Sequence, residues 1–427
     1  MRNRLLRRIK LEDFYIRSSL FAFLSLVGAI LNYALYPSLA HVLNPTEFGD
    51  FVAVLAISNQ LLGIMLAFTL TSISLVNTYP EDEAREKAQI IQKVLIWLFL
   101  GATAVLLVVS PLIRQQLHIV DPLTFVILAL LLVAAVPAVM WTGYLQGHQR
   151  VIKVGIYNVA GVVSKLVLAL LFARLWGVSG GLLGVLAGTM LGILTLRLIA
   201  GMRLPSLRSS LTPLTASQWT YVRGTMTSLG VSVLVVGMLS VLQNIDIIFA
   251  KILFPPAVAG VYSGISVLSN ALYFLGLLLV WIVLPAVSPA NPRHNRRLLR
   301  TSYSLLALMA VGVMAGEYLL RNVLARSLLG LAFGGQGDIL ILASLFQILL
   351  VGSTLYAYYL LVLRRKRSLL LAGCVFLPSV AAPAVLVPGD TRAMITTLLL
   401  ATLLGWVAYG IGSGIYHVVL HARGRTQ

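Results

Sequence analysis

Apolar runs of about 20 residues recur along this whole chain, and each is long enough to cross a lipid bilayer as a helix. Of the 427 residues, 59% are hydrophobic and only 11% are charged, and the mean hydropathy is +0.95. A soluble domain carries about 25% charged residues. Because lipid offers the backbone no hydrogen-bond partner, and because the runs are too apolar for alternating barrel strands, the sequence predicts an all-α polytopic membrane protein.

We expect about twelve transmembrane helices in two sets of six. The first set lies near residues 17–43, 51–78, 90–112, 123–145, 154–175 and 178–200. The second set lies near residues 225–253, 258–287, 299–323, 338–362, 368–388 and 393–420. The longest polar connection, from Met202 to Trp219, separates the sets. This pattern predicts an N-terminal bundle (1–205), a cytoplasmic linker (206–224) and a C-terminal bundle (225–427).

The two sets repeat one another. Pro256, Gly260, Tyr262, Ser269 and Asn270 each lie 211 positions after Pro45, Gly49, Phe51, Ser58 and Asn59, respectively. A repeat of nearly half the chain predicts two copies of one bundle. Because corresponding helices run in the same direction, we expect a pseudo-two-fold axis along the membrane normal.

Basic residues in the short loops predict the orientation. Of the 32 Lys and Arg residues, 25 fall on the side of both termini, 6 fall on the other side, and Lys165 lies within a span. By the positive-inside rule, both termini are expected in the cytoplasm, which requires an even number of spans. Topology therefore explains most of the net charge of +19.

The acidic run Glu81, Asp82, Glu83 and Glu86 is expected to be a solvated turn.

The sequence lacks the usual signatures of an enzyme. It contains no Walker phosphate loop, no zinc-spaced His and Glu pairing and no nucleophile elbow. The single cysteine, Cys374, cannot form an intramolecular disulfide, and no external loop is long enough for a catalytic domain. We therefore expect no catalytic residue, no metal site and no nucleic-acid partner. The only small co-substrate left open is a coupling ion, H+ or Na+.

Lys165 is the first candidate for substrate binding. A cation at the centre of a transmembrane helix costs about 2.5–3.5 kcal/mol on insertion scales, so it should face a partner or a wet cavity. Asn158, Gly161 and Lys165 share one helical face. We expect this face to line a cavity, with Asn158 and Lys165 contacting the substrate. The alternative is a structural ion pair between Lys165 and Asp246.

Asp246 lies inside the seventh predicted span beside Gln243 and Asn244. Asp246 and Asn244 are candidates for coupling or gating, and the alternative is a helix contact of Asp246 with Lys165 or Lys251. The other acidic residue well inside a span is Glu317, four residues before Arg321. That spacing favours a local structural ion pair.

Further polar candidates lie at equivalent places in the two halves. Ser263, Ser266, Asn270 and Tyr273 form a stripe on the eighth predicted span, and Ser58 and Asn59 begin its counterpart on the second. Such side chains either bind sugar hydroxyls or hold helices together. Arg17 and Arg223 stand at the cytoplasmic start of each half. They either hold a substrate phosphate or contact anionic lipid headgroups.

Gly180, Gly184, Gly188 and Gly192 recur every four residues along the sixth predicted span. Glycine at this spacing leaves one helix face flat, which allows another helix to approach closely. We therefore assign these four residues to helix packing.

Several motifs resemble those of a known family. The run Leu43–Gly49 resembles the turn after the first helix of bacterial polysaccharide flippases, and Gly143–Gly147 with Arg150 resembles their turn between helices four and five. Asn244 and Asp246, together with Gly260–Ser263, resemble their seventh and eighth helices, and the glycine series resembles their sixth. The likeness covers most of residues 15–290. It identifies the chain as similar to the multidrug, oligosaccharidyl-lipid and polysaccharide exporter superfamily.

This resemblance implies two six-helix bundles around a cavity that opens alternately to either side of a bacterial inner membrane. The implied cargo is a polyprenyl-diphosphate-linked oligosaccharide, flipped to the outer leaflet for the synthesis of O-antigen, capsule or exopolysaccharide. The implied partners are this lipid-linked oligosaccharide, membrane lipids, and possible glycan polymerase and assembly proteins. No catalysed reaction is implied.

Alternatives remain within and outside the superfamily. Drug exporters usually carry an acidic residue in the first helix, and residues 17–43 contain none. Lipid II flippases typically have two extra helices, so we expect them to resemble this chain less. An ion-coupled exporter of small molecules is the main alternative function. A membrane glycan polymerase and a structural partner in glycan assembly are less favoured.

Overall fold

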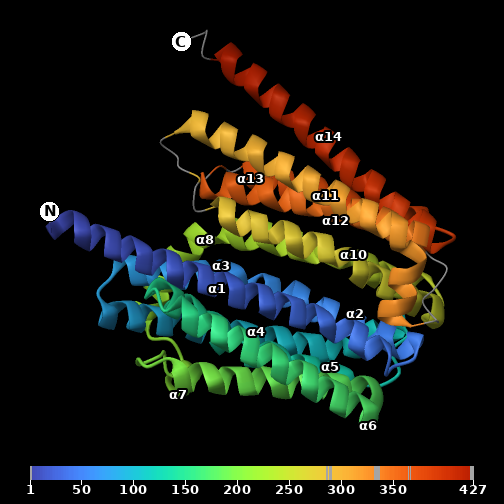
Figure 1. The fold of residues 1–427 in the computed structure, drawn as a ribbon, viewed down its shortest axis with the longest axis horizontal. Helices are drawn as coiled ribbons and strands as arrows, with labels where there is room; N and C mark the ends of the chain where they lie inside the picture. The colour runs from blue at the N-terminus through green and yellow to red at the C-terminus, as the bar shows by residue number, and fades with distance from the viewer. Residues whose placement is uncertain are drawn as a thin grey trace. The chain divides into compact units, whose positions relative to one another are not determined.

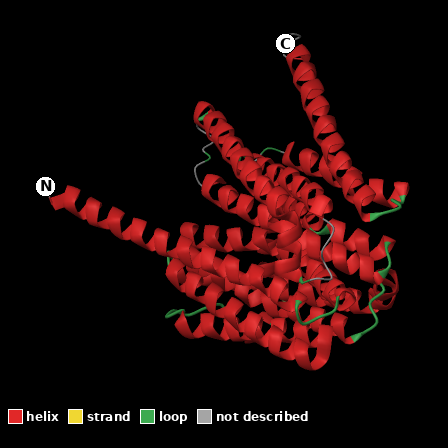
Figure 2. Ribbon diagram, turned by 45° about the vertical axis from the view of Figure 1, so that its right-hand side comes forward, coloured by secondary structure: helices red, strands yellow, loops and turns green. Residues whose placement is uncertain are grey.

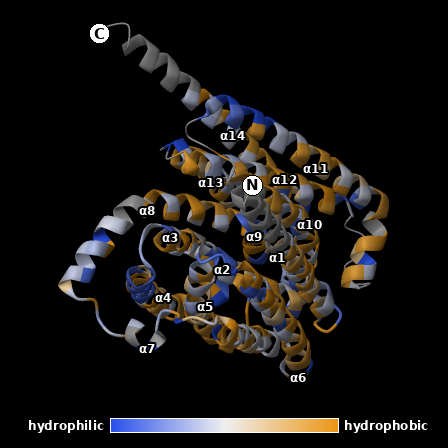
Figure 3. Ribbon diagram, turned by 60° about the vertical axis from the view of Figure 1, so that its left-hand side comes forward, coloured by the Kyte–Doolittle hydropathy of each residue, from blue (hydrophilic) through white to orange (hydrophobic). Residues whose placement is uncertain are grey.

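The computed structural model is built from α-helices connected by short loops (Figure 2). It describes residues 2–284, 287, 291–330, 337–363, 365 and 367–423. No strand occurs among those residues. Hydrophobic residues run along most of the helices (Figure 3). The all-α membrane fold predicted from the apolar runs is therefore confirmed.

The chain divides into two compact units, which we call the N-terminal unit (Met1–Leu229) and the C-terminal unit (Gly230–Gln427). Figure 1 labels most of their helices, and Figure 3 labels α9. The N-terminal unit contains α1 (Arg2–Ala40), α2 (Pro45–Gly63), α3 (Met65–Thr78), α4 (Glu81–Leu117), α5 (Leu123–Gly147), α6 (Val151–Ile199), α7 (Leu207–Ser210) and the start of α8 (Ala216–Gln243). Within it, α5 is the central helix and contacts α2, α3, α4 and α6, while α1 packs along α6.

The C-terminal unit begins within α8. Its other helices are α9 (Ile245–Leu253), α10 (Pro256–Val283), α11 (Pro292–Leu329), α12 (Gly337–Val362), α13 (Arg367–Leu386) and α14 (Thr391–Arg423). Here α12 is central, because it contacts α10, α11, α13 and α14. Each unit therefore surrounds one apolar helix with its neighbours, as expected for a membrane bundle.

The number of helices agrees with the prediction of about twelve spans. In the part of the chain that the structure describes, ten helices are long and apolar enough to cross a membrane, and the bent α8 brings the number to eleven. The 49-residue α6 accounts for the twelfth, because Trp176 and Gly177 leave helical geometry and divide it into two legs. Gly177 has φ +57°, a conformation that glycine adopts without strain. The two legs correspond to the predicted spans 154–175 and 178–200.

The run Leu43–Gly49 contains the start of α2, which begins at Pro45. Asn44 caps the helix: its side chain accepts a hydrogen bond from the Glu47 backbone N–H at 2.9 Å, and the Glu47 carboxylate accepts one from the Asn44 N–H at 3.1 Å. This reciprocal pair satisfies two backbone donors that the first helical turn leaves open. Pro45 follows in the first helical position, where its missing N–H costs nothing.

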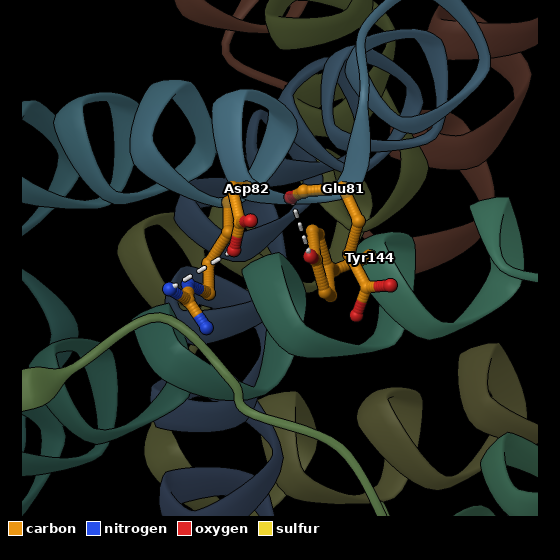
Figure 4. A network of polar contacts seen from close by, with 4 residues as sticks. Glu81, Asp82 and Tyr144 are labelled. Carbon is orange, nitrogen blue, oxygen red and sulfur yellow. Dashed lines mark hydrogen bonds and ion pairs between the residues drawn. The ribbon is translucent and has the colours of Figure 1, made fainter.

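The acidic segment predicted to be a solvated turn is instead the first part of α4 (Figure 4). Carboxylates are favourable at a helix N-terminus because the exposed N–H groups carry partial positive charge. Arg85 pairs with Asp82 at 3.4 Å, and Lys87 pairs with Glu83 at 3.3 Å, both within the helix. The Tyr144 hydroxyl of α5 donates to the Glu81 carbonyl at 3.4 Å. Local pairing and the helix dipole therefore extended the helix beyond its apolar part.

The segment between the two predicted bundles packs on the N-terminal unit. The Trp141 indole donates to the Pro205 carbonyl at 3.1 Å, and the Gln92 amide donates to the Ser210 hydroxyl at 2.9 Å. Residues 207–210 and 216–224 of the predicted linker are helical. Lys87 lies 4.7 Å from the Tyr221 ring, a cation–π contact that attaches the start of α8.

Candidate functional site

The glycine series of α6 lies where the two legs of this helix pack against each other. A Cβ atom added to Gly184 would overlap the Ala169 backbone, and one added to Gly188 would overlap the Lys165 backbone. One added to Gly192 would lie 3.1 Å from the Gly161 Cα. Each step of four residues along one leg matches a step of four in the opposite direction on the other. The legs are therefore antiparallel and in backbone contact.

The side chain of Lys165 passes beside Gly188 of the second leg. Its Cγ would stand 2.8 Å from a Cβ on Gly188, so the glycine makes room for the aliphatic stem of the lysine. Lys165 is half-buried. In the N-terminal unit as described, no hydrogen bond or ion pair joins its ammonium group to another residue. A cation inside an apolar span without a partner is costly, which marks Lys165 as a candidate functional residue.

The face shared by Asn158, Gly161 and Lys165, which we expected to line a cavity, is largely a packing face. Gly161 meets Gly192 on the second leg, and Asn158 lies beside Gly28 of α1, 3.8 Å from the Cβ that Gly28 lacks. The physical reason is the glycine series, which brings the second leg onto this face. Asn158 remains half-buried, so part of it stays accessible.

Three further predicted residues belong to the N-terminal unit. Asn59 of α2 is half-buried, and its side chain lies near Tyr36 of α1. Arg223 is exposed on the first part of α8. Arg17 lies within the helical span of α1, but its side chain is outside the described residues. The structure places Asn158 and Lys165 on one leg of α6, and the other residues of this group come from three other helices.

In the C-terminal unit, Asp246 is fully buried at the start of α9. Its Oδ2 atom accepts hydrogen bonds from the Tyr262 hydroxyl at 2.9 Å and the Ser266 hydroxyl at 2.5 Å, both on α10. Its other oxygen, Oδ1, is buried without a hydrogen-bond partner among the described residues. Tyr262 was not among the predicted site residues. The sequence signal that could have found it is the repeat: Tyr262 is equivalent to Phe51, and the tyrosine adds a hydroxyl that the phenylalanine lacks.

Asn244 interrupts the helix between α8 and α9, and it contacts Asn270 of α10. The Asn270 amide donates to the Asn244 side-chain oxygen at 3.3 Å. Gln347 of α12 approaches the same break, with its amide 3.5 Å from the Gln243 carbonyl. Within the described residues, Asn244 Nδ2, Asn270 Oδ1 and Gln347 Oε1 are buried without a hydrogen-bond partner. Such groups cost about 1–3 kcal/mol each, which marks this cluster as more than a helix contact.

The stripe Ser263, Ser266, Asn270 and Tyr273 is buried against neighbouring helices rather than open. Ser266 and Asn270 bond to the segment around Asp246, and the Tyr273 hydroxyl lies 3.4 Å from the Thr354 hydroxyl of α12. For Ser266 and Tyr273, these contacts favour the role of holding helices together.

Two other buried charged residues belong to this unit. Glu317 of α11 is buried with the Ser344 hydroxyl of α12 nearby. The side chain of Arg321, its predicted partner, is outside the described residues. Lys251 of α9 is also fully buried and makes a contact within the protein. The sequence analysis named Lys251 only as an alternative partner of Asp246, and its burial was not expected because it was counted with the loop residues.

Two open clefts are lined by described residues other than those above. One, with a volume of about 470 Å³, lies at the kink of α6 and is lined by His41, Glu47, Arg174 and Gly177, among others. Another, of about 410 Å³, runs along α11 from Arg297 to Leu308.

Comparison with known proteins identifies the fold. No protein-family model matches the chain, and no curated protein matches its sequence. Among solved structures, the lipid II flippase MurJ in an inward closed conformation superposes with a TM-score of 0.70 at 12% identity, covering 92% of this chain and 87% of that one. The chain has the fold of these transporters.

Two transporters of the multidrug MATE family show the same likeness. An inward-facing MATE transporter of the MOP superfamily, to which the exporters named above belong, gives a TM-score of 0.68 at 14% identity and covers 90% of this chain and 94% of that one. The eukaryotic MATE transporter AtDTX14 gives 0.65 at 13% identity and covers 93% and 95%. The expected superfamily fold is therefore confirmed. We expected lipid II flippases to resemble this chain less than other transporters do. At the level of fold this difference is not seen, because the lipid II flippase and the two MATE transporters superpose on it about equally well.

Proposed function

We propose that this protein is a flippase that moves a polyprenyl-diphosphate-linked oligosaccharide from the cytoplasmic to the outer leaflet. The observation that carries this proposal is Lys165, whose ammonium group lies within an apolar span and has no partner among the described residues of the N-terminal unit. A diphosphate headgroup needs such a cation when it leaves water, because charge-assisted hydrogen bonds replace part of its hydration. The fold supports the proposal, since transporters with this fold include a named lipid flippase.

The proposed mechanism is alternating access. The N-terminal unit presents Lys165 with Asn158 and Asn59 to the headgroup, while Arg17 and Arg223 attract the phosphates at the cytoplasmic side. The prenyl tail stays in lipid, so only the polar headgroup crosses. No covalent bond forms or breaks. We place the protein in a bacterial inner membrane with both termini in the cytoplasm, where glycan polymerase and assembly proteins are the proposed partners.

Replacing Lys165 tests this proposal. Lys165→Ala should abolish surface glycan in cells without loss of protein from the membrane. With purified protein, binding of farnesyl diphosphate should weaken roughly tenfold to a hundredfold, as expected for one hydrogen bond to a charged group. Lys165→Arg should retain part of the binding. Full export by Lys165→Ala would refute the role of this lysine.

The second candidate is ion-coupled export of a small molecule. The observation that favours it is the buried cluster around Asp246, where two hydroxyls point at one carboxylate oxygen and three amide atoms remain unpaired. Carboxylate and amide oxygens can hold H+ or Na+, so Asp246 and Asn244 are proposed coupling residues in either function. Asp246→Asn should stop transport driven by an imposed proton or sodium gradient. Export of a dye by the wild type, with no glycan phenotype in Lys165→Ala, would favour this second function.

A further inference from the structure

The C-terminal unit contains a cluster of four aromatic side chains that none of the assignments above uses. Tyr356 and Tyr359 lie on α12, and Trp406 and Tyr409 lie on α14. The Tyr356 ring contacts the other three, with centroid distances of 6.0 Å to Tyr359, 5.9 Å to Trp406 and 6.0 Å to Tyr409. Tyr356 and Tyr359 are nearly parallel, at an interplanar angle of 16°.

A hydrogen bond and ring contacts hold these side chains in place. The Trp406 indole donates to the hydroxyl of the buried Ser353 at 2.9 Å, and the Trp406 and Tyr409 rings meet edge to face with their centroids 6.3 Å apart. Tyr356, Tyr359 and Trp406 are nevertheless half-exposed. A rigid set of aromatic faces that are packed on one side and open on the other can bind a ligand at low entropic cost.

The open side is not the apolar surface of α14. That surface is formed by Leu404, Val407 and Ile411, which are 65%, 58% and 60% exposed. At 100° per residue, Trp406 and Tyr409 project well away from the centre of this surface. On α12, the two tyrosines belong to the central helix, which has neighbours in α10, α11, α13 and α14. Aromatic residues of a membrane interface, in contrast, project toward the lipid.

Basic residues stand beside the cluster. Arg365, which is exposed, follows the end of α12 that carries Tyr359, where its backbone N–H donates to the Leu360 carbonyl at 2.9 Å, and Arg367 begins α13. They belong to the loop that the distribution of basic residues assigns to the cytoplasm. The aromatic faces and the guanidinium groups together match a ligand with an apolar-faced ring, several hydroxyls and a phosphate.

We propose that Tyr356, Tyr359 and Trp406 form a sugar-stacking platform on which the first pyranose of the cargo lies, with Arg365 and Arg367 beside its phosphates. The C–H faces of a pyranose ring pack on aromatic rings, and its hydroxyls find partners in the tyrosines. This inference rests on the proposed function and adds to it the part of the headgroup that the C-terminal unit recognises.

Two short-chain probes test the platform with the full-length purified protein. Farnesyl diphosphate carries the phosphates alone, and farnesyl diphosphate N-acetylglucosamine adds one sugar. The wild type should bind the second probe about tenfold more tightly, as expected for one aromatic contact. Tyr359→Leu should remove this difference while leaving the binding of farnesyl diphosphate unchanged. Trp406→Phe, which keeps an aromatic face, should retain most of the difference.

The control is Trp97→Leu, which removes an exposed aromatic of α4 in the other unit and should keep the full difference. Binding of farnesyl diphosphate reports whether each variant is folded. Equal binding of the two probes by the wild type, or a preserved difference in Tyr359→Leu, would overturn the platform and leave the flippase proposal standing. If neither probe binds the wild type, both proposals fail together.

Discussion

The glycine series of α6 makes the sharpest prediction about stability. In Gly184→Ala, the new methyl carbon would stand less than 2.5 Å from the nitrogen and Cα of Ala169 on the opposite leg. Carbon atoms make ordinary contact at about 3.5–4.0 Å, so the shortfall is about 1 Å. The atoms in the way belong to the backbone, which cannot rotate aside as a side chain can. The two legs would therefore have to separate.

The cost follows from this geometry. Inserting one methyl group into a packed contact costs about 1–3 kcal/mol, and separating the legs also weakens the neighbouring contacts at Gly188 and Gly192. Replacing glycine by alanine within a helix stabilises the helix by up to about 1 kcal/mol, because alanine has the higher helix propensity. We expect a net loss of stability, seen as a lower melting temperature of the purified protein in detergent.

Gly101→Ala is the matched control, because Gly101 lies within α4 and a Cβ there would meet nothing within 4 Å. This variant keeps the propensity gain without the overlap, so it should melt at or above the wild-type temperature. If Gly184→Ala melts as high as Gly101→Ala, the two legs do not pack through their backbones as described.

Three other outcomes follow from particular contacts. Lys165→Met should raise the melting temperature, because it removes a charge that costs about 2.5–3.5 kcal/mol in a span, and a lower temperature would reveal a structural partner. Asn44→Ala should lose about 0.5–2 kcal/mol with the cap of α2, while Thr46→Ala in the same turn should stay near wild type in thermal unfolding. Trp141→Phe removes the bond to Pro205 and should speed proteolysis between residues 206 and 215, whereas Trp97→Phe at a 50% exposed position should not.

Much of the fold could be predicted from local pattern. The apolar runs and the break at Gly177 depend on properties of neighbouring residues, namely hydropathy and glycine conformation. The helix boundaries were less predictable. At Glu81, favourable charge at a helix N-terminus and pairing within the helix outweighed the polarity that suggested a turn.

The candidate site divides in the same way. The sequence alone determined which polar residues lie inside apolar spans: Lys165, Asn244 and Asp246 stand out because the cost of burying them is set by the lipid, whatever the fold. Only the tertiary structure decided what each one meets. Tyr262 and Ser266 reach Asp246 from another helix, and Gly188 makes room for Lys165 across the turn of α6. The physical reason is that the apolar residues around a position determine whether it lies in lipid or in water. The partners of its side chain depend instead on how the helices rotate and pack against one another.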